Sequence, residues 1–332
     1  MSPPLLSVVI PVYNEAAGLP ALFARLYPAL DALQIRYEVI FVNDGSRDKS
    51  AAVLKDQFAA RPDVTRVVFF NANYGQHLAI LAGFERVRGE RIVTLDADLQ
   101  NPPEEIGKLL AAMDAGADYV GGVRRTREDS WWRRTASRLM NRLRERITRI
   151  RMTDQGCMLR AYSRDIVDAV AAAREVSTYI PALAYTFAHH PVEVDVLHEE
   201  RAAGESKYSM YRLIRLNFDL ITGFSLVPLQ LFSVAGMIVA MTSVVLYVVV
   251  IAQRAIVGGF VEGIKAFWDR DILAFFLIGC IMFGVGLLGE YVGRIYQQVR
   301  DRPRYVIRAV LERDADVELP AHAGAESVRL IR

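Results

Sequence analysis

The stretch "IVTLDADLQNPPEEI", residues 92–106, combines the features from which both the fold and the chemistry are predicted. It opens on an apolar run of four residues, which is typical of a buried strand. It continues with Asp96, Asp98 and Gln100 at alternate positions, and it closes on Asn101, two prolines and two glutamates. That closing pattern predicts the start of a helix. The two carboxylates at the end of a buried strand need an explanation, because neighbouring like charges repel each other.

The same order of strand, polar turn and helix recurs from residue 5 to about residue 123. Apolar runs alternate there with amphipathic stretches of helical period, which predicts an α/β fold with a mostly parallel, Rossmann-like sheet covered on both faces. Such sheets bind ligands at the carboxyl ends of their strands. Polar clusters occur at these ends: "YNE" at 13–15, "NDGS" at 43–46, "NANYGQH" at 71–77 and "DADLQN" at 96–101.

Two long segments lack charged residues in this chain of 332 residues, 52% of which are hydrophobic. One lies between Asp219 and Arg254, and the other lies between Asp271 and Glu290. A membrane helix needs about 20 apolar residues. The segments therefore predict a C-terminal two-helix transmembrane hairpin within residues 227–295. Arginines follow the second segment, and positive flanks mark the cytoplasmic side, so both termini are predicted to be cytoplasmic.

Charge and cysteine content narrow the possible partners. The two cysteines, Cys157 and Cys280, are too few for a disulfide framework or a zinc site. The net charge of +2 hides a local excess of arginine in residues 130–151, where apolar residues recur at helical spacing. Such a basic amphipathic helix suits a bilayer surface, although an ordinary surface helix would show the same pattern. A second interfacial helix is predicted at 207–226, and no nucleic-acid partner is expected.

Asp96 and Asp98 are candidate metal ligands. Alternate residues of an extended chain share a face, and two carboxylates placed together need a cation or a proton. Hard oxygen ligands suit Mg²⁺ or Mn²⁺, and Gln100 could add a neutral oxygen. The competing interpretation is that Asn101 caps the following helix, with glutamates near its positive end. That interpretation explains residues 101–105 but leaves the two aspartates unexplained.

The polar residues after the first two strands have two interpretations as well. Asp44 could accept hydrogen bonds from a base or a ribose, and Gly45 would allow a ligand to approach closely. A strand-to-helix turn with Asp or Ser as the cap would look the same. Glu15 is at a predicted helix N-terminus, where a carboxylate is favoured for structural reasons too.

Taken together, the motifs resemble the nucleotide-binding half of the family 2 glycosyltransferases, which have the GT-A fold. These motifs are "SVVIPVYNE" at 7–15, "NDGS" at 43–46 and "TLDADLQNPPEEI" at 94–106. The later stretches "MTDQGCMLRAYSRDIVDAV" and "HEERAAGESKYS" resemble its membrane branch, the polyprenyl-phosphate glycosyltransferases. Within that branch, "NYGQH" and "GCMLRAY" are most similar to the members that transfer 4-deoxy-4-formamido-L-arabinose. The similarity runs from about residue 5 to residue 308.

This resemblance implies that a sugar passes from a UDP-sugar to undecaprenyl (polyprenyl) phosphate, with inversion at the anomeric carbon. It implies a tetrameric protein of the bacterial inner membrane that acts in lipid A modification and polymyxin resistance. Its motifs place uridine at Pro11, Tyr13, Glu15 and Asp44 and a metal at Asp96, Asp98 and Gln100. Arg124, at the end of the fifth predicted strand, could add charge against the donor phosphate or be a surface arginine of an arginine-rich run. Arg201, Ser206 and Lys207 could hold the acceptor phosphate, although lipid headgroups would also attract a lysine at a membrane boundary. Asn43 departs from the pattern, since many relatives have Asp there.

Asp154 matches the position often assigned as the catalytic base of the family. The acceptor, however, is a phosphate monoester, whose second pKa is ~6. Its oxygen is mostly ionised at neutral pH, which leaves a general base little proton to remove. Our hypothesis is that Asp154 orients the acceptor or supports the metal site.

The predicted organisation has six parts. They are a nucleotide-sugar-binding core at 1–129, an interfacial helix at 130–151, the rest of the catalytic domain with the acceptor-phosphate loop at 152–206, a second interfacial helix at 207–226, two transmembrane helices at 227–295 and a cytoplasmic tail at 296–332.

Three alternatives stay open to different degrees. A polyprenyl-phosphate hexosyltransferase would share all these motifs. A processive polysaccharide synthase would carry a Q-x-x-R-W segment and more spans, which this chain lacks. A non-catalytic membrane adaptor would tolerate the loss of Asp96, Asp98 and Lys207 together.

His77 could face the donor sugar, cap a helix or pack in the core.

Overall fold

The structure is a computed structural model, and it describes most of the chain around the sheet together with part of the C-terminal region. The described residues are 4–124, 150, 152–154, 156–173, 179–199, 227, 229–236, 238, 241–242, 245, 270–299 and 303–313. The chain divides into two compact units. The first comprises Met1–Arg142, Ile150–Tyr208 and Arg302–Arg332, and the second comprises Leu143–Arg149 and Ser209–Asp301.

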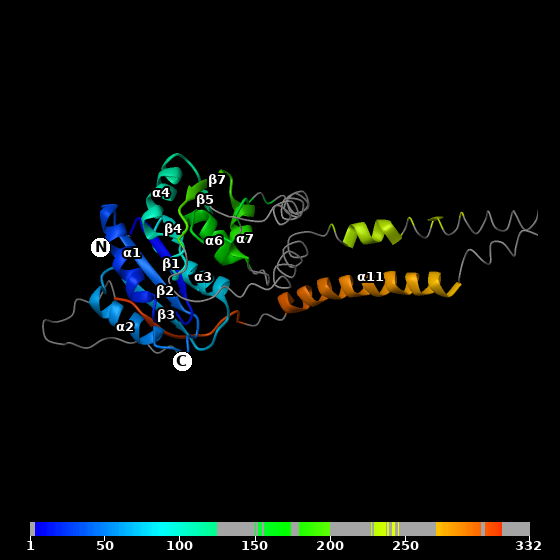
Figure 1. The fold of residues 1–332 in the computed structure, drawn as a ribbon, viewed down its shortest axis with the longest axis horizontal. Coiled ribbons are helices and arrows are strands. Elements are labelled where there is room, and N and C mark those ends of the chain that lie inside the picture. The colour runs from blue at the N-terminus through cyan, green and yellow to red at the C-terminus, as the bar shows by residue number, and fades with distance from the viewer. Residues whose placement is uncertain are drawn as a thin grey trace, which may run out of the picture. The chain divides into compact units, whose positions relative to one another are not determined.

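An eight-stranded sheet forms the centre of the first unit, in the order β7-β5-β6-β4-β1-β2-β3-β8 (Figure 1). The strands are β1 (Leu6–Val12), β2 (Tyr37–Asn43), β3 (Thr65–Phe70), β4 (Arg91–Thr94), β5 (Tyr119–Arg124), β6 (Arg160–Ser163), β7 (Pro191–Val196) and β8 (Ile307–Leu311). β6 runs antiparallel to β4 and β5, and β8 runs antiparallel to β3, whereas the other neighbours pair in parallel. The sheet is therefore mixed but mostly parallel, which confirms the expected GT-A-like α/β fold.

Helices cover both faces of this sheet. They are α1 (Leu19–Ala32), α2 (Ser50–Ala60), α3 (Gln76–Phe84), the 3₁₀ turn η1 (Pro103–Glu105), α4 (Ile106–Asp114), α6 (Arg164–Ala172) and α7 (Ile180–Phe187). The even-numbered residues of β1 share one core cluster with α1 and α4. Val9, which points to the opposite face, lies against Gly83 of α3, and α3 packs with α6 and α7.

Helix α1 shows how the sequence anchors these layers. Leu19, Leu22, Leu26 and Leu30 recur every three or four residues and are fully buried, so they form one continuous apolar stripe. Burying one such side chain contributes about 1.5–3 kcal/mol. Pro20 stands in the first turn, where the missing N–H costs nothing. The helix is thereby fixed against the sheet directly after the polar loop that follows β1.

The sequence did not reveal three of the strands. β6 and β7 come from the segment assigned only as the rest of the catalytic domain, and β8 comes from the predicted tail. In β8, Ala309 pairs with Phe69 and Leu311 pairs with Val67 of β3. The residues after α11 (Arg270–Val299) thus supply the edge strand of the sheet.

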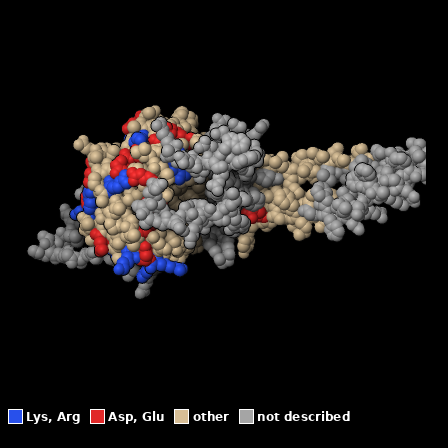
Figure 2. All heavy atoms as spheres, in the orientation of Figure 1, with Lys and Arg blue, Asp and Glu red and all other residues tan. Residues whose placement is uncertain are grey.

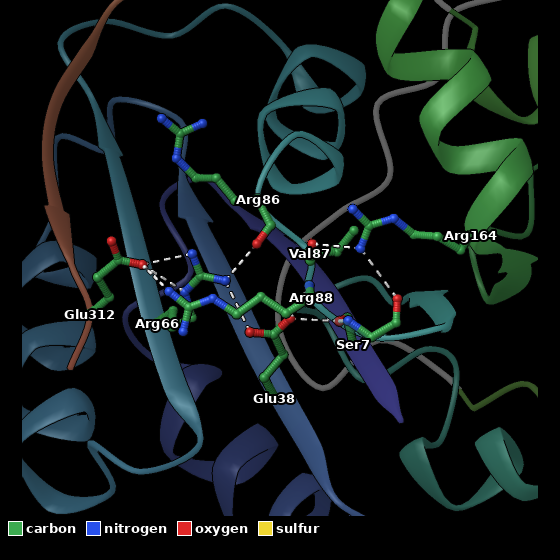
Figure 3. A network of polar contacts seen from close by, with 9 residues as sticks. Ser7, Glu38, Arg66, Arg86, Val87, Arg88, Arg164 and Glu312 are labelled. Atoms are coloured by element: carbon green, nitrogen blue, oxygen red, sulfur yellow. Dashed lines mark hydrogen bonds and ion pairs between the residues drawn. The ribbon is translucent and has the colours of Figure 1, made fainter. Parts of the chain in front are cut away.

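A buried polar network joins β8 to the middle of the sheet (Figure 3). Glu38 of β2 accepts hydrogen bonds from Ser7 Oγ at 2.6 Å, from the backbone N–H of Arg88 at 2.6 Å and from Arg66 Nη1 at 2.9 Å. Arg66 also pairs with Glu312, which follows β8, at 2.7 Å. Glu38 and Arg66 are only 5% and 8% exposed. Each charge is compensated by several partners, as buried charges require.

The second unit contains α11 and the helical residues 229–236. Phe232 lies against Gly284, and its ring is 5.9 Å from that of Phe283, so these two segments pack on each other. On the face shown, their described surface is nearly uncharged, in contrast to the mixed charges of the first unit (Figure 2). No helix within the described part of the chain is both long and apolar enough to cross a membrane.

Several expectations fall on residues that lie outside the described part of the chain. They are both interfacial helices, apart from Ile150, and the acceptor-phosphate residues Arg201, Ser206 and Lys207. These expectations stay predictions.

Replacing Glu38 by Ala is expected to lower the free energy of unfolding by about 3 kcal/mol, because it leaves a buried guanidinium and a buried hydroxyl short of a partner. Urea unfolding of the purified protein measures this change. Asp114→Ala is the control, since it removes an ion pair whose Asp114 side chain is 61% exposed and should cost less than about 1 kcal/mol. Equal effects of the two substitutions would contradict the importance of the network.

Candidate active site

The carboxyl ends of β4, β1 and β2 lie at one edge of the sheet, because the three strands are parallel neighbours. Three of the polar clusters predicted to bind ligand follow these ends. Pro11 is within β1 opposite Val42 of β2, and Tyr13, just beyond β1, is 43% exposed. The structure therefore brings the ends that carry Glu15, Asp44 and Asp96 to the same side of the domain.

The loops after β1 and β2 are bonded to each other. The backbone N–H of Asn14 donates to Ser46 Oγ at 3.0 Å, and Asn14 Oδ1 accepts from the backbone N–H of Arg47 at 2.8 Å. The backbone N–H of Glu15 donates to Ser50 Oγ at 3.0 Å. The hydroxyls of Ser46 and Ser50 thus bind the backbone of the loop after β1. These bonds set the backbone position of Glu15 relative to the end of β2.

Asp44 organises a third loop, the one that follows β3. Its side chain is buried, and its carboxylate accepts from the backbone N–H groups of Tyr74 at 2.7 Å and Gly75 at 2.8 Å and from Asn73 Nδ2 at 2.9 Å. Burial raises the pKa of Asp44 above its ordinary value, and the two backbone hydrogen bonds oppose that rise. The carboxylate predicted to hold a nucleoside therefore already holds residues 73–75 in place.

Gly45 makes the contact between these two loops possible. Its φ is +63°, and a Cβ at this position would lie 2.3 Å from the carbonyl carbon of Ala72. A side chain would clash with the backbone there and would also strain the left-handed conformation. In the structure the group that approaches Gly45 closely is the protein's own loop, and the approach of a ligand there stays a prediction.

Asp96 and Asp98 lie beyond the end of β4, which stops at Thr94. A turn begins at residue 97, so the alternation of an extended strand does not apply to the two aspartates. Asp96 Oδ1 accepts from Gln76 Nε2 at 2.6 Å, and Asp98 Oδ1 accepts from the backbone N–H of Gln100 at 3.2 Å. That Asp96, Asp98 and Gln100 bind one metal ion stays a prediction.

The donor chemistry of this loop fits Mg²⁺ or Mn²⁺. Within the described residues there is no group of three or more His, Cys, Asp or Glu that could hold a metal ion. Mg²⁺, however, is commonly bound through one or two carboxylates, with water and substrate phosphates completing its shell. Two carboxylates and one amide oxygen are sufficient for a site of that kind.

Asn101 does not cap the following helix, contrary to the competing interpretation. The turn η1 begins after Pro102 and has no side-chain cap. Asn101 is buried instead, and its Oδ1 is 3.5 Å from Cys157 Sγ. The side chain thus links the acidic loop to the segment before β6, a long-range contact that local sequence does not signal.

Arg124 and Asp154 form a bidentate ion pair. Arg124 Nε is 2.5 Å from Asp154 Oδ2, and Arg124 Nη2 is 2.8 Å from Oδ1. The side chains are 18% and 10% exposed, and the backbone N–H of Gly156 adds a hydrogen bond of 3.0 Å to Oδ1. Two residues predicted separately as site residues are thereby one unit at the end of β5.

This pairing determines the ionisation of Asp154. Burial alone would raise its pKa, but the hydrogen bonds and the charge of Arg124, together with backbone N–H groups, hold the pKa below its ordinary value. Asp154 in turn raises the pKa of Arg124, and the charge of Asp96 adds to that effect. A carboxylate held ionised by a fork of two donors is a poor proton acceptor. The geometry thus favours an orienting role over that of a base.

Sequence reasoning missed Arg160 of β6. Its guanidinium is fully buried and donates to the backbone oxygens of Asp154 at 2.6 Å and Cys157 at 2.8 Å, as well as to the hydroxyl of Tyr119. It holds the backbone that carries Asp154. An arginine in a short apolar run was the available signal, but its partners are distant in sequence.

His77 behaves as a packed residue. Burial lowers its pKa to about 4, which keeps the imidazole neutral. Its ring lies edge-on to the ring of Tyr179, with centroids 5.1 Å apart. The packing alternative is therefore favoured.

The segment that leads toward the predicted acceptor loop is bonded to the acidic loop. The backbone N–H of Glu199 donates to Gln100 O at 2.9 Å. Arg25 of α1 pairs with both Glu199, at 2.8 Å, and Glu104, at 3.0 Å. The last described residues before position 200 therefore lie beside the predicted metal ligands.

Comparisons with known proteins agree on a family. The profile described as "Glycosyl transferase family 2" matches residues 7–171. The undecaprenyl-phosphate 4-deoxy-4-formamido-L-arabinose transferase of Aeromonas hydrophila subsp. hydrophila is 47% identical over 92% of this chain and 94% of its own length. The enzyme of the same name from Serratia proteamaculans is 50% identical over 92% of this chain and 93% of its own length.

Two solved structures with a similar fold show a distant likeness. Glucosyl-3-phosphoglycerate synthase from Mycobacterium tuberculosis is 17% identical, with a TM-score of 0.46 over 67% of this chain and 79% of that one. Mannosyl-3-phosphoglycerate synthase from Rubrobacter xylanophilus is 14% identical, with a TM-score of 0.47 over 66% of this chain and 72% of that one. Likeness at this level carries no argument about ligands. The identity of 47–50% to the two transferases over 92% of this chain is decisive, and the chain belongs to glycosyl transferase family 2.

Proposed function

We propose that the protein is an inverting glycosyltransferase that moves 4-deoxy-4-formamido-L-arabinose from a UDP-linked donor to undecaprenyl phosphate. The observation that carries this proposal is the 46–50% identity, over 92–93% of the chain, to five transferases that bear this activity in their names. The convergence of polar loops at one edge of the sheet supports it, since that edge is where α/β sheets bind ligands.

The donor nucleotide is proposed to bind at the ends of β1 and β2. Pro11, Tyr13 and Glu15 would contact the uridine from one loop, and Asp44 would do so from the other. The hydrogen bonds between these loops support this assignment, because they hold the backbone of both loops before any ligand arrives. Such preorganisation reduces the entropy cost of binding.

The diphosphate of the donor is proposed to bind at the acidic loop. Asp96, Asp98 and Gln100 would hold Mg²⁺ or Mn²⁺, an ion that neutralises the departing diphosphate. Arg124 carries a fixed positive charge at the end of β5, where it can add to this neutralisation. Its bidentate contact with Asp154 restricts the guanidinium to one orientation, so Asp154 positions that charge rather than removing a proton.

The acceptor is proposed to reach the site from the bilayer. Arg201, Ser206 and Lys207 would hold its phosphate. The tether from Glu199 to the acidic loop supports this placement, since it brings the chain to the site two residues before Arg201. The two interfacial helices and a transmembrane hairpin within 227–295 would seat the enzyme in the bacterial inner membrane, with its catalytic domain and both termini cytoplasmic. The assembly is proposed to be a tetramer acting in lipid A modification.

The sugar is tested by incubating the full-length protein and undecaprenyl phosphate with a panel of UDP-sugars. Mass spectrometry of the lipid product is expected to show the formamido-pentose adduct from its UDP donor. The UDP-hexoses should react at least about 100-fold more slowly, because a site that hydrogen-bonds a polar substituent strongly rejects analogues that lack it. A hexosyl lipid as the main product would overturn the sugar assignment but not the reaction class.

The metal site is tested by Asp98→Asn. Transfer is expected to fall at least about 100-fold, since one well-placed electrostatic group is worth about 100- to 1,000-fold in rate. Metal-dependent UDP binding should weaken in parallel, while the circular dichroism spectrum stays unchanged. Asp168→Asn is the matched control, because that aspartate pairs with Arg164 on the exposed face of α6. Normal turnover by Asp98→Asn would rule out the metal role.

The role of Asp154 is tested by the pH dependence of kcat/KM for the acceptor, measured on the wild type and on Asp154→Asn. The depressed pKa keeps Asp154 ionised throughout pH 5–9, so it contributes no titration there. Both proteins should lose rate about tenfold per pH unit below about 6, where the acceptor phosphate takes up a proton. Asp154→Asn should be slower by a constant factor. A rate that recovers steeply with rising pH in the variant alone would identify Asp154 as a true base.

A further inference from the structure

Gln76 connects two loops that the proposed function treats separately. Its amide Nε2 lies 2.6 Å from Asp96 Oδ1. Gln76 belongs to α3, which follows β3, whereas Asp96 follows β4. Two strands, β1 and β2, separate β3 from β4 in the sheet, so the side chain of Gln76 bridges to an element that is not its sheet neighbour.

Asp44 sets the position from which Gln76 reaches across. The three hydrogen bonds to its carboxylate come from residues 73, 74 and 75, the three residues directly before Gln76. Gly75 then adopts a φ of +101°, which L side chains rarely adopt. That conformation lets α3 begin at Gln76 itself. The start of the helix is therefore fixed by a buried carboxylate at the end of β2.

The body of α3 is anchored as well. Ala79, Ile80, Leu81 and Ala82 are fully buried, and the helix packs on β1 and β2. The backbone of Gln76 is therefore held in place, while its exposed side chain is held by the hydrogen bond to Asp96. The loop before Gln76 and the buried residues after it thus both fix the position from which Gln76 contacts Asp96.

A neutral amide is the type of donor that a metal-binding carboxylate can use. The torsion that rotates a carboxylate is soft, so a hydrogen bond to one oxygen restricts how the group presents itself. A Lys or Arg donor would add a positive charge that competes with a cation, whereas an amide adds none. Partners of this kind around metal ligands typically change metal affinity by about 10–100-fold when removed.

From these contacts we infer that Gln76 is a positioning residue for the metal: it orients Asp96, and the Asp44-anchored loop 73–75 sets its place. The inference rests on the proposed function, because it takes Asp96 to be a metal ligand. It deepens that function by coupling the nucleotide loop to the metal loop through one short segment. Any movement of loop 73–75 would be passed to Asp96.

The test measures UDP binding to the full-length protein by calorimetry over a series of Mn²⁺ concentrations. Gln76→Ala is expected to raise the Mn²⁺ concentration that gives half-maximal UDP binding by about 10–100-fold. The UDP affinity at saturating Mn²⁺ should stay within about twofold of wild type. A residue that only maintained the fold of the loop would instead lower the UDP affinity at all Mn²⁺ concentrations.

Two further variants sharpen this experiment. Gln76→Asn keeps an amide but is one methylene shorter, so it cannot span to Asp96 and should reproduce the weakened Mn²⁺ dependence. It also tests the inference if Gln76→Ala fails to fold. Gln57→Ala is the matched control, since it removes a glutamine of α2 that lies near Tyr27, and it should leave the Mn²⁺ dependence unchanged.

The outcomes separate the inference from the function on which it rests. A wild type without Mn²⁺-dependent UDP binding would remove the proposed metal site and the inference together. A wild type that shows it, with Gln76→Ala and Gln76→Asn titrating like the wild type, would overturn the inference alone. A defect of equal size in UDP affinity at saturating Mn²⁺ would also overturn it, in favour of a structural role.

Discussion

The parallel pairing of β4, β1 and β2 is the constraint on which the candidate active site depends. Because these strands are neighbours and run in one direction, the loops that leave them emerge at one edge. Strand order alone does not fix the side chains, however. Hydrogen bonds between loops do so: Asn14 donates to the loop after β2, residues 73–75 donate to Asp44, and Gln76 donates to Asp96. The site is built from loop-to-loop contacts on a rigid edge.

Much of this fold was predictable, because buried parallel strands are apolar throughout and the intervening helices have a clear period. The first five strands and the helices between them follow from that pattern. The pattern does not reveal β6, whose four residues include Arg160 and Ser163, or β8, whose run is embedded in an arginine-rich segment. Both strands are defined by antiparallel partners far away in sequence, as when Leu311 pairs with Val67. Local periodicity carries no information on such pairings.

The candidate site, like the fold, was predictable from the sequence only in part. The rule that ligands bind at strand ends selected Glu15, Asp44, Asp96 and Arg124 as candidate site residues. It did not anticipate that Arg124 pairs with Asp154, because a contact between β5 and a segment before β6 depends on tertiary packing. The competing capping interpretation assigned Asn101 to a helix cap, whereas the buried side chain contacts Cys157. Residue type at a strand end thus indicates the kind of chemistry, whereas the partner of each group depends on the whole fold.

Asp44 shows how binding and architecture can share one carboxylate. An ionised carboxylate offers about four acceptor positions, and residues 73–75 occupy three of them. At most one position is left for a nucleoside. A direct contact would therefore be a single hydrogen bond to a carboxylate that already binds the loop. Most of the influence of Asp44 on donor binding would then pass through the loop it holds. Gln76 directly follows that loop and donates a hydrogen bond to Asp96. Asp44 therefore influences the metal loop indirectly, through residues 73–76, without contacting it.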